Sequence, residues 1–114
     1  MSNNKFGAKA TTRNGYSFDS LVERDRWQEL ELWQAAGGIT ALTHHPVYAL
    51  IVHEILICRY EADSSYQLVD TEEFIVEDVK SNATVNLDTF RIKRALMLAL
   101  LGITVRIELR NGRR

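Results

Sequence analysis

The sequence is poor in cysteine and proline, with one residue of each, and it has no long apolar run. The single cysteine, Cys58, excludes an internal disulfide framework and is typical of a reducing compartment. No apolar stretch approaches the roughly 18–20 residues that a membrane-spanning helix needs, and the N-terminus lacks the pattern of a secretory signal. We therefore expect a soluble cytoplasmic protein with no membrane partner.

The sequence also has no excess of either charge, since 14 Lys and Arg residues meet 15 Asp and Glu residues. Such a chain is not a polycation that coats nucleic acid indiscriminately. The charges are unevenly placed, however: basic residues dominate from Phe90 onward, and carboxylates are frequent between residues 19 and 78. This polarity suits an acidic metal-binding centre beside a basic surface for phosphates, although solvated faces would give the same pattern.

A length of 114 residues with 46% hydrophobic content predicts one globular domain. Residues 1–16 are polar and small, so they are predicted to form a flexible N-terminal arm, followed by a folded domain over 17–110 and a basic tail over 111–114. Because a chain this short buries a limited share of its surface, a second subunit would add stability, and a homodimer is consistent with the length.

The first helix is predicted over residues 20–36. Ser20 and Glu23 have the spacing of a capping box, and two consecutive glycines supply the stop. Glu23 shares a stripe of this helix with Trp27 and Leu30. Glu23 therefore either completes the cap or points with Trp27 into the interior, where a metal-binding acid would sit, and the spacing leaves both interpretations open.

The rest of the chain predicts strands and one further helix. Residues 39–69 favour a β-meander in which Asp63 ends a strand that begins at Ile55. The last third predicts a βαβ unit: a strand over 74–80, a helix over 87–101 closed by Gly102, and a parallel strand over 103–109 with Ile103, Val105, Ile107 and Leu109 facing inward. The expected fold class is α/β, a single domain with a mixed β-sheet and flanking helices in the order α-β-β-β-α-β.

The strand over 74–80 carries the residues best suited to chemistry. Its alternation places Asp78 and Lys80 on one face and Glu77 on the other. A carboxylate can bind Mg²⁺ while a lysine positions the attacking water or stabilises developing charge, which is a combination suited to phosphodiester hydrolysis. Asp63 is the expected second carboxylate, because a hairpin-like return would bring it beside Asp78. An Asp-x-Lys triplet alone is a weak signal, and its context strengthens it.

Several segments together resemble a known family of short phage and prophage proteins, which is named only as a domain of unknown function and placed in the PD-(D/E)xK nuclease superfamily. The resemblance covers about residues 5–106. It is carried by Phe18–Glu23 opening a helix, Gly38-Ile39, His45-Pro46, Tyr60–Asp63, and Val76–Lys80 preceding a helix.

The resemblance implies a restriction-endonuclease-like core and a DNA endonuclease that depends on Mg²⁺, with Mn²⁺ as a substitute. It further implies work in phage DNA metabolism inside a bacterial host, with branched DNA such as Holliday junctions as a natural substrate. By resemblance, Asp63 and Asp78 are the paired metal-binding acids and Lys80 is the superfamily lysine. Glu23 is the first-helix glutamate that holds or orients metal.

Contacts with DNA are expected from basic residues at the second helix and in the N-terminal arm, namely Arg91, Lys93, Arg94, Lys9 and Arg13. The leucine-rich second helix is apolar on nearly every side, which predicts that it is buried in the core or covered by a second subunit. An alternative function is a non-catalytic DNA-binding or phage assembly protein that keeps the nuclease fold, since fold alone does not fix activity.

The three histidines and Cys58 are candidate zinc ligands by residue type. No CxxC or HxxxH pair accompanies them, so ordinary loop and strand positions are expected, although His44 or His45 could contact phosphate.

Overall fold

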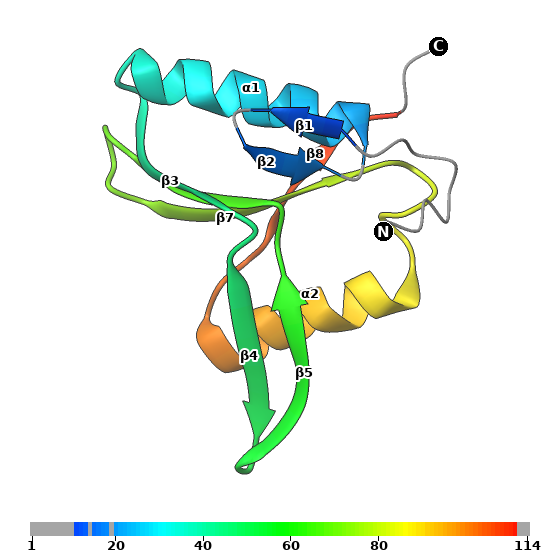
Figure 1. The fold of residues 1–114 in the computed structure, drawn as a ribbon. Coiled ribbons are helices and arrows are strands. Elements are labelled where there is room, and N and C mark those ends of the chain that lie inside the picture. The colour runs from blue at the N-terminus through cyan, green and yellow to red at the C-terminus, as the bar shows by residue number, and fades with distance from the viewer. Residues whose placement is uncertain (1–10, 14, 19, 112–114) are drawn as a thin grey trace.

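The computed structural model describes residues 11–13, 15–18 and 20–111, although the side chains of 11–13 and 17 are not among the described atoms. Figure 1 shows the elements along the chain. In order they are β1 (Thr11–Arg13), β2 (Tyr16–Phe18), α1 (Leu21–Ala35), β3 (Ile39–His44), β4 (Val47–Val52), β5 (Ile55–Glu61), β6 (Ser64–Leu68), β7 (Phe74–Lys80), α2 (Asp88–Leu101) and β8 (Arg106–Leu109).

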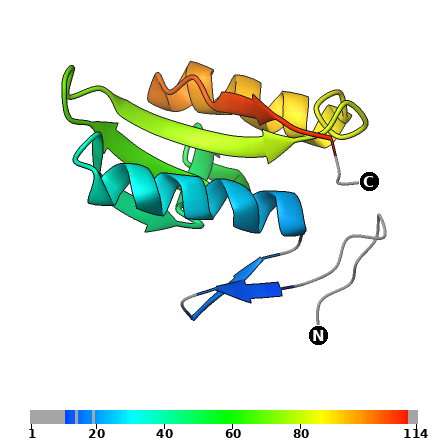
Figure 2. The same cartoon turned by 90° about the horizontal axis from the view of Figure 1, so that it is seen from above.

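The central layer is a four-stranded sheet in the order β3-β6-β7-β8. Strands β3 and β7 both pair antiparallel with β6, and β8 pairs parallel with β7. Helix α1 lies on one side of this sheet and α2 on the other (Figures 1 and 2). The predicted single domain with a mixed sheet and flanking helices is therefore confirmed, as is the parallel pairing of the last two strands.

The structure differs from the predicted meander over residues 39–69. The chain bends sharply between β3 and β4 and again between β5 and β6, so this region forms four strands. Beyond the bend, β4 and β5 form a separate hairpin that leaves the sheet (Figure 1). The bend is held by hydrogen bonds from His45 N to Asp63 O at 3.1 Å and from Ala62 N to Pro46 O at 3.0 Å. Strand β5 ends at Glu61, so Asp63 lies in the corner rather than at a strand end.

Local signals explain both helices. The Ser20 hydroxyl accepts a hydrogen bond from Glu23 N at 3.2 Å, which caps α1 as the spacing predicted. Helix α2 ends at Gly102, whose φ of +69° is the left-handed conformation that glycine adopts freely. Within the described part of the chain, neither helix combines the length and apolar character needed to cross a membrane.

Two apolar cores lie on the two faces of the sheet. The core on the α1 side contains Leu30, Ile39 and Tyr66. The larger core, on the α2 side, is built from Leu50, Tyr60, Ala62, Val76, Phe90, Met97 and Val105. Along β7, Val76 thus faces α2 while Ile75 faces α1, and this alternation continues through the residues that matter for chemistry.

One expectation about burial was wrong. Leu109 was predicted to face inward, but it is 53% exposed, because it pairs with Lys80 at the margin of the sheet. The strand itself begins only at Arg106, although Val105 before it is fully buried. Helix α2 buries Phe90 and Met97 in the core, yet several of its large apolar residues stay exposed, namely Ile92, Leu98, Leu100 and Leu101.

Candidate active site

Asp63 and Asp78 lie side by side. The register of β6 and β7 pairs Ser64 with Glu77, so the residue before Ser64 adjoins the residue after Glu77. Asp63 N donates to Asp78 Oδ1 at 2.8 Å, and Val79 N donates to Asp63 Oδ2 at 2.7 Å. The structure therefore brings together the two aspartates that the sequence singled out, and it does so through the hairpin-like return of β6 onto β7.

Tyr60 is a third member of this site that the sequence did not identify. Its hydroxyl donates to Asp78 Oδ2, and its side chain is only 3% exposed. Burial, followed by the charge of Asp78, raises the pKa of Tyr60. The sequence offered one signal, because a buried tyrosine hydroxyl needs a partner and Tyr60 lies three residues before Asp63.

Both aspartates sit in an environment that disfavours their charge. Burial raises the pKa of Asp63 well above its ordinary value, and the charges of Glu23 and Asp78 raise it further. Burial also raises the pKa of Asp78, against the hydrogen bond from Tyr60 and the charge of Lys80, which lower it. Two neighbouring carboxylates of raised pKa are a place where a divalent cation would be bound favourably.

Lys80 lies on the same face of β7 as Asp78, as predicted, and its Nζ is 4.4 Å from the centre of the Phe90 ring. This ammonium borders a cavity of about 420 Å³ beside the aspartates. The walls of the cavity come from β5, β7 and α2: Arg59, Tyr60, Glu61, Asp78, Lys80, Leu87, Thr89, Phe90 and Lys93. A hollow that combines two carboxylates with three basic side chains can hold both a cation and an anionic substrate.

Glu23 approaches Asp63 from the α1 side of the sheet. Its backbone N–H serves the cap, while its side chain, 11% exposed, lies with Oε1 2.9 Å from His45 Nε2. The side chain therefore points to the interior, while the Ser20 hydroxyl caps the backbone of the same residue. Asp78 is on the α2 side, so Asp63 stands between the other two carboxylates.

The donor set of the aspartates fits Mg²⁺. This ion takes oxygen ligands and is usually held by one or two carboxylates together with waters. Asp63 and Asp78 supply two adjacent carboxylates, and Glu23 lies close enough to raise the pKa of Asp63. Within the described residues, these three carboxylates are not a group whose ligand atoms all lie within 4.8 Å of one another. Glu23 is therefore not gathered with the two aspartates into one such ligand group.

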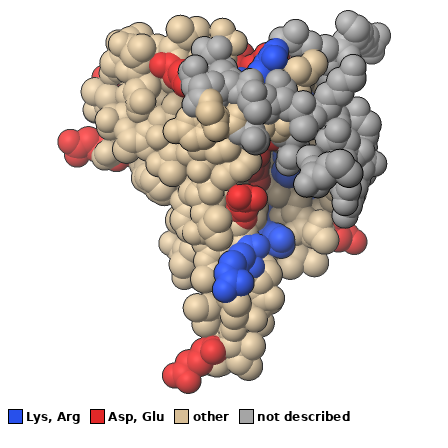
Figure 3. All heavy atoms as spheres, viewed as in Figure 1, with Lys and Arg blue, Asp and Glu red and all other residues tan. Residues whose placement is uncertain are grey.

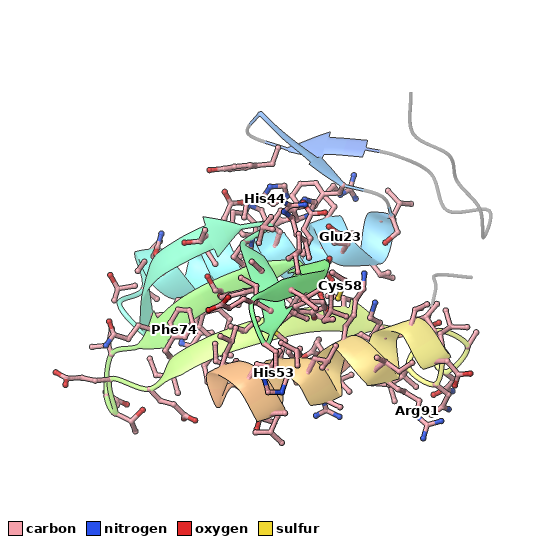
Figure 4. All side chains as sticks on the ribbon, turned by 90° about the horizontal axis from the view of Figure 1, so that it is seen from below. Glu23, His44, His53, Cys58, Phe74 and Arg91 are labelled. Carbon is pink, nitrogen blue, oxygen red and sulfur yellow. The ribbon has the colours of Figure 1, made fainter. Side chains whose placement is uncertain are left out.

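The predicted DNA-binding residues have different surroundings. Lys93 borders the cavity, whereas the Nε of Arg94 donates to Val105 O at 3.0 Å. Arg91 Nη1 lies 3.8 Å from Asp88 Oδ1, and the Arg91 side chain is on the outer side of α2 (Figure 4). The predicted contacts by Lys9 and by the side chain of Arg13 fall outside the described part of the structure.

The four residues weighed as a zinc set do not gather at one place. His53 lies in the turn at the far end of the β4–β5 hairpin and Cys58 lies on β5, while His44 lies near Glu23 (Figure 4). His45 is beside the aspartates, because its backbone N–H donates a hydrogen bond to Asp63 O and its ring Nε2 is hydrogen-bonded to the Glu23 carboxylate. The sequence analysis considered His45 as a zinc ligand or a phosphate contact and did not place it beside the aspartates.

Comparison with curated proteins and with solved structures gives no match. Comparison with protein families gives one that extends over most of the chain. Residues 3–100, which span every element up to most of α2, match the family described as "Protein of unknown function (DUF1064)", and the chain belongs to this family.

Proposed function

We propose that this protein is a divalent-metal-dependent DNA endonuclease of the PD-(D/E)xK type. The observation that carries the proposal is the hydrogen bond from Asp63 N to Asp78 Oδ1, which joins the two aspartates beside a cavity lined by Asp78, Lys80 and Lys93. The order of these residues along the chain, with Glu23 on a preceding helix, agrees with the resemblance described above. Paired acids and a strand lysine are suited to phosphodiester hydrolysis.

Each residue then has a distinct task. Asp63 and Asp78 hold Mg²⁺, or Mn²⁺ as a substitute, which when bound supplies charge that polarises the scissile phosphate. The Lys80 ammonium positions the attacking water and stabilises the charge that develops on the phosphate. Tyr60 fixes the orientation of Asp78 through its hydroxyl. Lys93 contacts a neighbouring phosphate of the DNA backbone.

Incubation of the full chain with supercoiled, linear and four-way-junction DNA tests this proposal. We expect cleavage in Mg²⁺ and none in EDTA. Asp78→Asn and Lys80→Ala should each slow cleavage by at least about 100-fold, since each removes several kcal/mol of transition-state stabilisation. Asp70→Asn, in the exposed turn between β6 and β7, is the matched control and should cut normally.

Binding measured on uncut DNA in Ca²⁺ separates the roles of the basic residues. Lys93→Ala should weaken binding and lower the salt slope by about one. Undiminished cleavage by Asp78→Asn or Lys80→Ala, with normal circular dichroism, would defeat the assignment. Preference among the three DNA forms would identify the substrate, and we propose branched DNA.

One observation favours a second function, a non-catalytic DNA-binding or phage assembly protein. Both oxygens of Asp78 already accept hydrogen bonds, from Asp63 N and from the Tyr60 hydroxyl. If these bonds persist, the carboxylate serves the corner of the fold rather than a metal. Binding of DNA without cutting in Mg²⁺ and in Mn²⁺ is the outcome that would select this alternative.

We also propose a homodimer in which a second copy covers the β4–β5 hairpin. A two-stranded ribbon is marginally stable by itself. Large apolar side chains are exposed along this hairpin, whose visible surface carries few charges (Figure 3): Val47, Ile51, Ile55, Leu56 and Ile57. Light scattering at micromolar concentration should give twice the mass of the chain, and Ile57→Lys should lower it. A monomeric wild type would contradict the proposal.

A further inference from the structure

Glu23 takes part in a second cluster, on the opposite side from Asp78. Glu23, His44 and His45 each offer one ligand atom, and these three atoms all lie within 4.8 Å of one another. This is the one such group of histidine, cysteine and acidic residues in the described parts of the chain. The cluster joins α1 to the end of β3 and to the corner before β4, and Figure 4 shows Glu23 and His44 near each other there.

The backbone of His45 is held in an unfavourable conformation. Its φ is +50°, in the left-handed region that non-glycine residues rarely occupy, and the following Pro46 disfavours helical backbone further. Such strain costs on the order of 1–3 kcal/mol and persists where the surrounding structure enforces it. Here the bonds between His45 N and Asp63 O and between Ala62 N and Pro46 O enforce it. The result is an imidazole held 2.9 Å from the Glu23 carboxylate.

His44 is fixed by aromatic packing instead. Its ring stacks on His45 with centroids 3.7 Å apart, and it is surrounded by other rings at 4.6–5.1 Å, those of Tyr16, Phe18 and Trp27. An imidazole enclosed in this way has little freedom to turn toward bulk water. The two ring planes are 16° apart, so the His45 ring must turn before both imidazoles can direct a nitrogen lone pair at one ion, while His44 is already held in place.

We propose that Glu23, His44 and His45 bind a divalent transition-metal ion of the Zn²⁺ class. Two imidazole nitrogens and a carboxylate suit Zn²⁺, whereas Mg²⁺ prefers an all-oxygen set such as the aspartates. Ligand atoms of a tetrahedral zinc site with bonds of about 2.0–2.1 Å are about 3.3 Å apart. The ligand atoms of Glu23, His44 and His45 need to approach one another by at most about 1.5 Å to reach this geometry. Water would complete the shell. The inference concerns metal binding only and stands whether or not the protein cuts DNA.

Titration of the metal-stripped full chain with Co²⁺, followed by visible absorption, and with Zn²⁺, followed by calorimetry, tests the site. We expect one equivalent to bind. His44→Asn and His45→Asn should each weaken binding by at least about tenfold, the lower bound for losing a group that supports a metal site. His53→Asn is the matched control, because His53 lies in the hairpin turn away from the cluster, and it should bind as the wild type does.

Two further measurements separate this site from the aspartates. Asp78→Asn should leave Zn²⁺ binding unchanged while abolishing Mg²⁺-dependent cleavage, so either proposal can fail alone. In the wild type, Zn²⁺ should protect His44 and His45, but not His53, from modification by diethyl pyrocarbonate, a readout that needs no variant to fold. Equal modification of all three histidines with and without Zn²⁺ overturns the inference, as does Zn²⁺ binding that is lost in Asp78→Asn and kept in both histidine variants.

Discussion

Arg26→Ala is expected to destabilise the protein by about 3–5 kcal/mol, because it leaves a buried charge without its partner. The Glu77 side chain is fully buried on the α1 face of β7. The Arg26 guanidinium donates two hydrogen bonds to the Glu77 carboxylate, from Nε to Oε2 at 2.8 Å and from Nη2 to Oε1 at 2.9 Å. The Tyr66 hydroxyl adds a third bond to Oε1 at 2.7 Å. Without Arg26, the carboxylate keeps the Tyr66 hydroxyl and the half-exposed Arg106 guanidinium, whose Nη1 is 3.8 Å from Oε1, and it loses both short charged hydrogen bonds.

Urea denaturation followed by circular dichroism measures this effect, and Arg110→Ala is its control. Arg110 binds Glu29 with two bonds of 2.6 Å, but their side chains are 27% and 47% exposed. An exposed pair contributes about 0–1 kcal/mol, so this variant should lose little. The double variant Arg26→Leu with Glu77→Leu should recover most of the stability, since no charge remains buried. Equal losses in Arg26→Ala and Arg110→Ala would show that the burial of Glu77 is not decisive.

This ion pair also shows how far the sequence could predict the fold. Alternation along β7 placed Glu77 opposite Asp78, and that placement is correct. Nothing local indicated that Arg26, 51 positions away, would meet it, because the pairing depends on how α1 packs across the sheet. Arg26 lies one helical turn after Glu23, so the pair fixes the part of α1 that carries the candidate metal-binding glutamate.

Some members of the candidate site could likewise be predicted from the sequence, and others could not. Spacing within one strand predicted the shared face of Asp78 and Lys80, and the length of the return predicted that Asp63 would adjoin Asp78. Tyr60 and His45 were missed as members, because both reach the site through the bend between the hairpin and the sheet. Periodicity in the sequence describes a straight strand. The bend at His45, whose backbone is left-handed, therefore leaves no regular pattern in the sequence.

Asp63→Asn is expected to stabilise the metal-free protein at neutral pH by about 0.5–2 kcal/mol, the range that single stabilising substitutions commonly give. The amide keeps an acceptor for Val79 N and removes a charge that burial, Glu23 and Asp78 all disfavour. Because the folded-state pKa of Asp63 is raised, the folded protein binds protons more tightly than the unfolded chain. The contribution of Asp63 to stability is therefore fully present below the ordinary aspartate pKa of about 3.9 and is lost as pH rises through the raised value.

Unfolding free energies in EDTA, measured between acidic and neutral pH, should accordingly decline more steeply for the wild type than for Asp63→Asn. Added Mg²⁺ should restore the wild type, by about 2.7 kcal/mol at a concentration 100 times the dissociation constant, and should restore the variant far less. Asp70→Asn should follow the wild type throughout. If Asp63→Asn instead destabilises the metal-free protein, then the carboxylate at this corner supports the fold through its hydrogen bonds, and the proposed cation site loses its electrostatic basis.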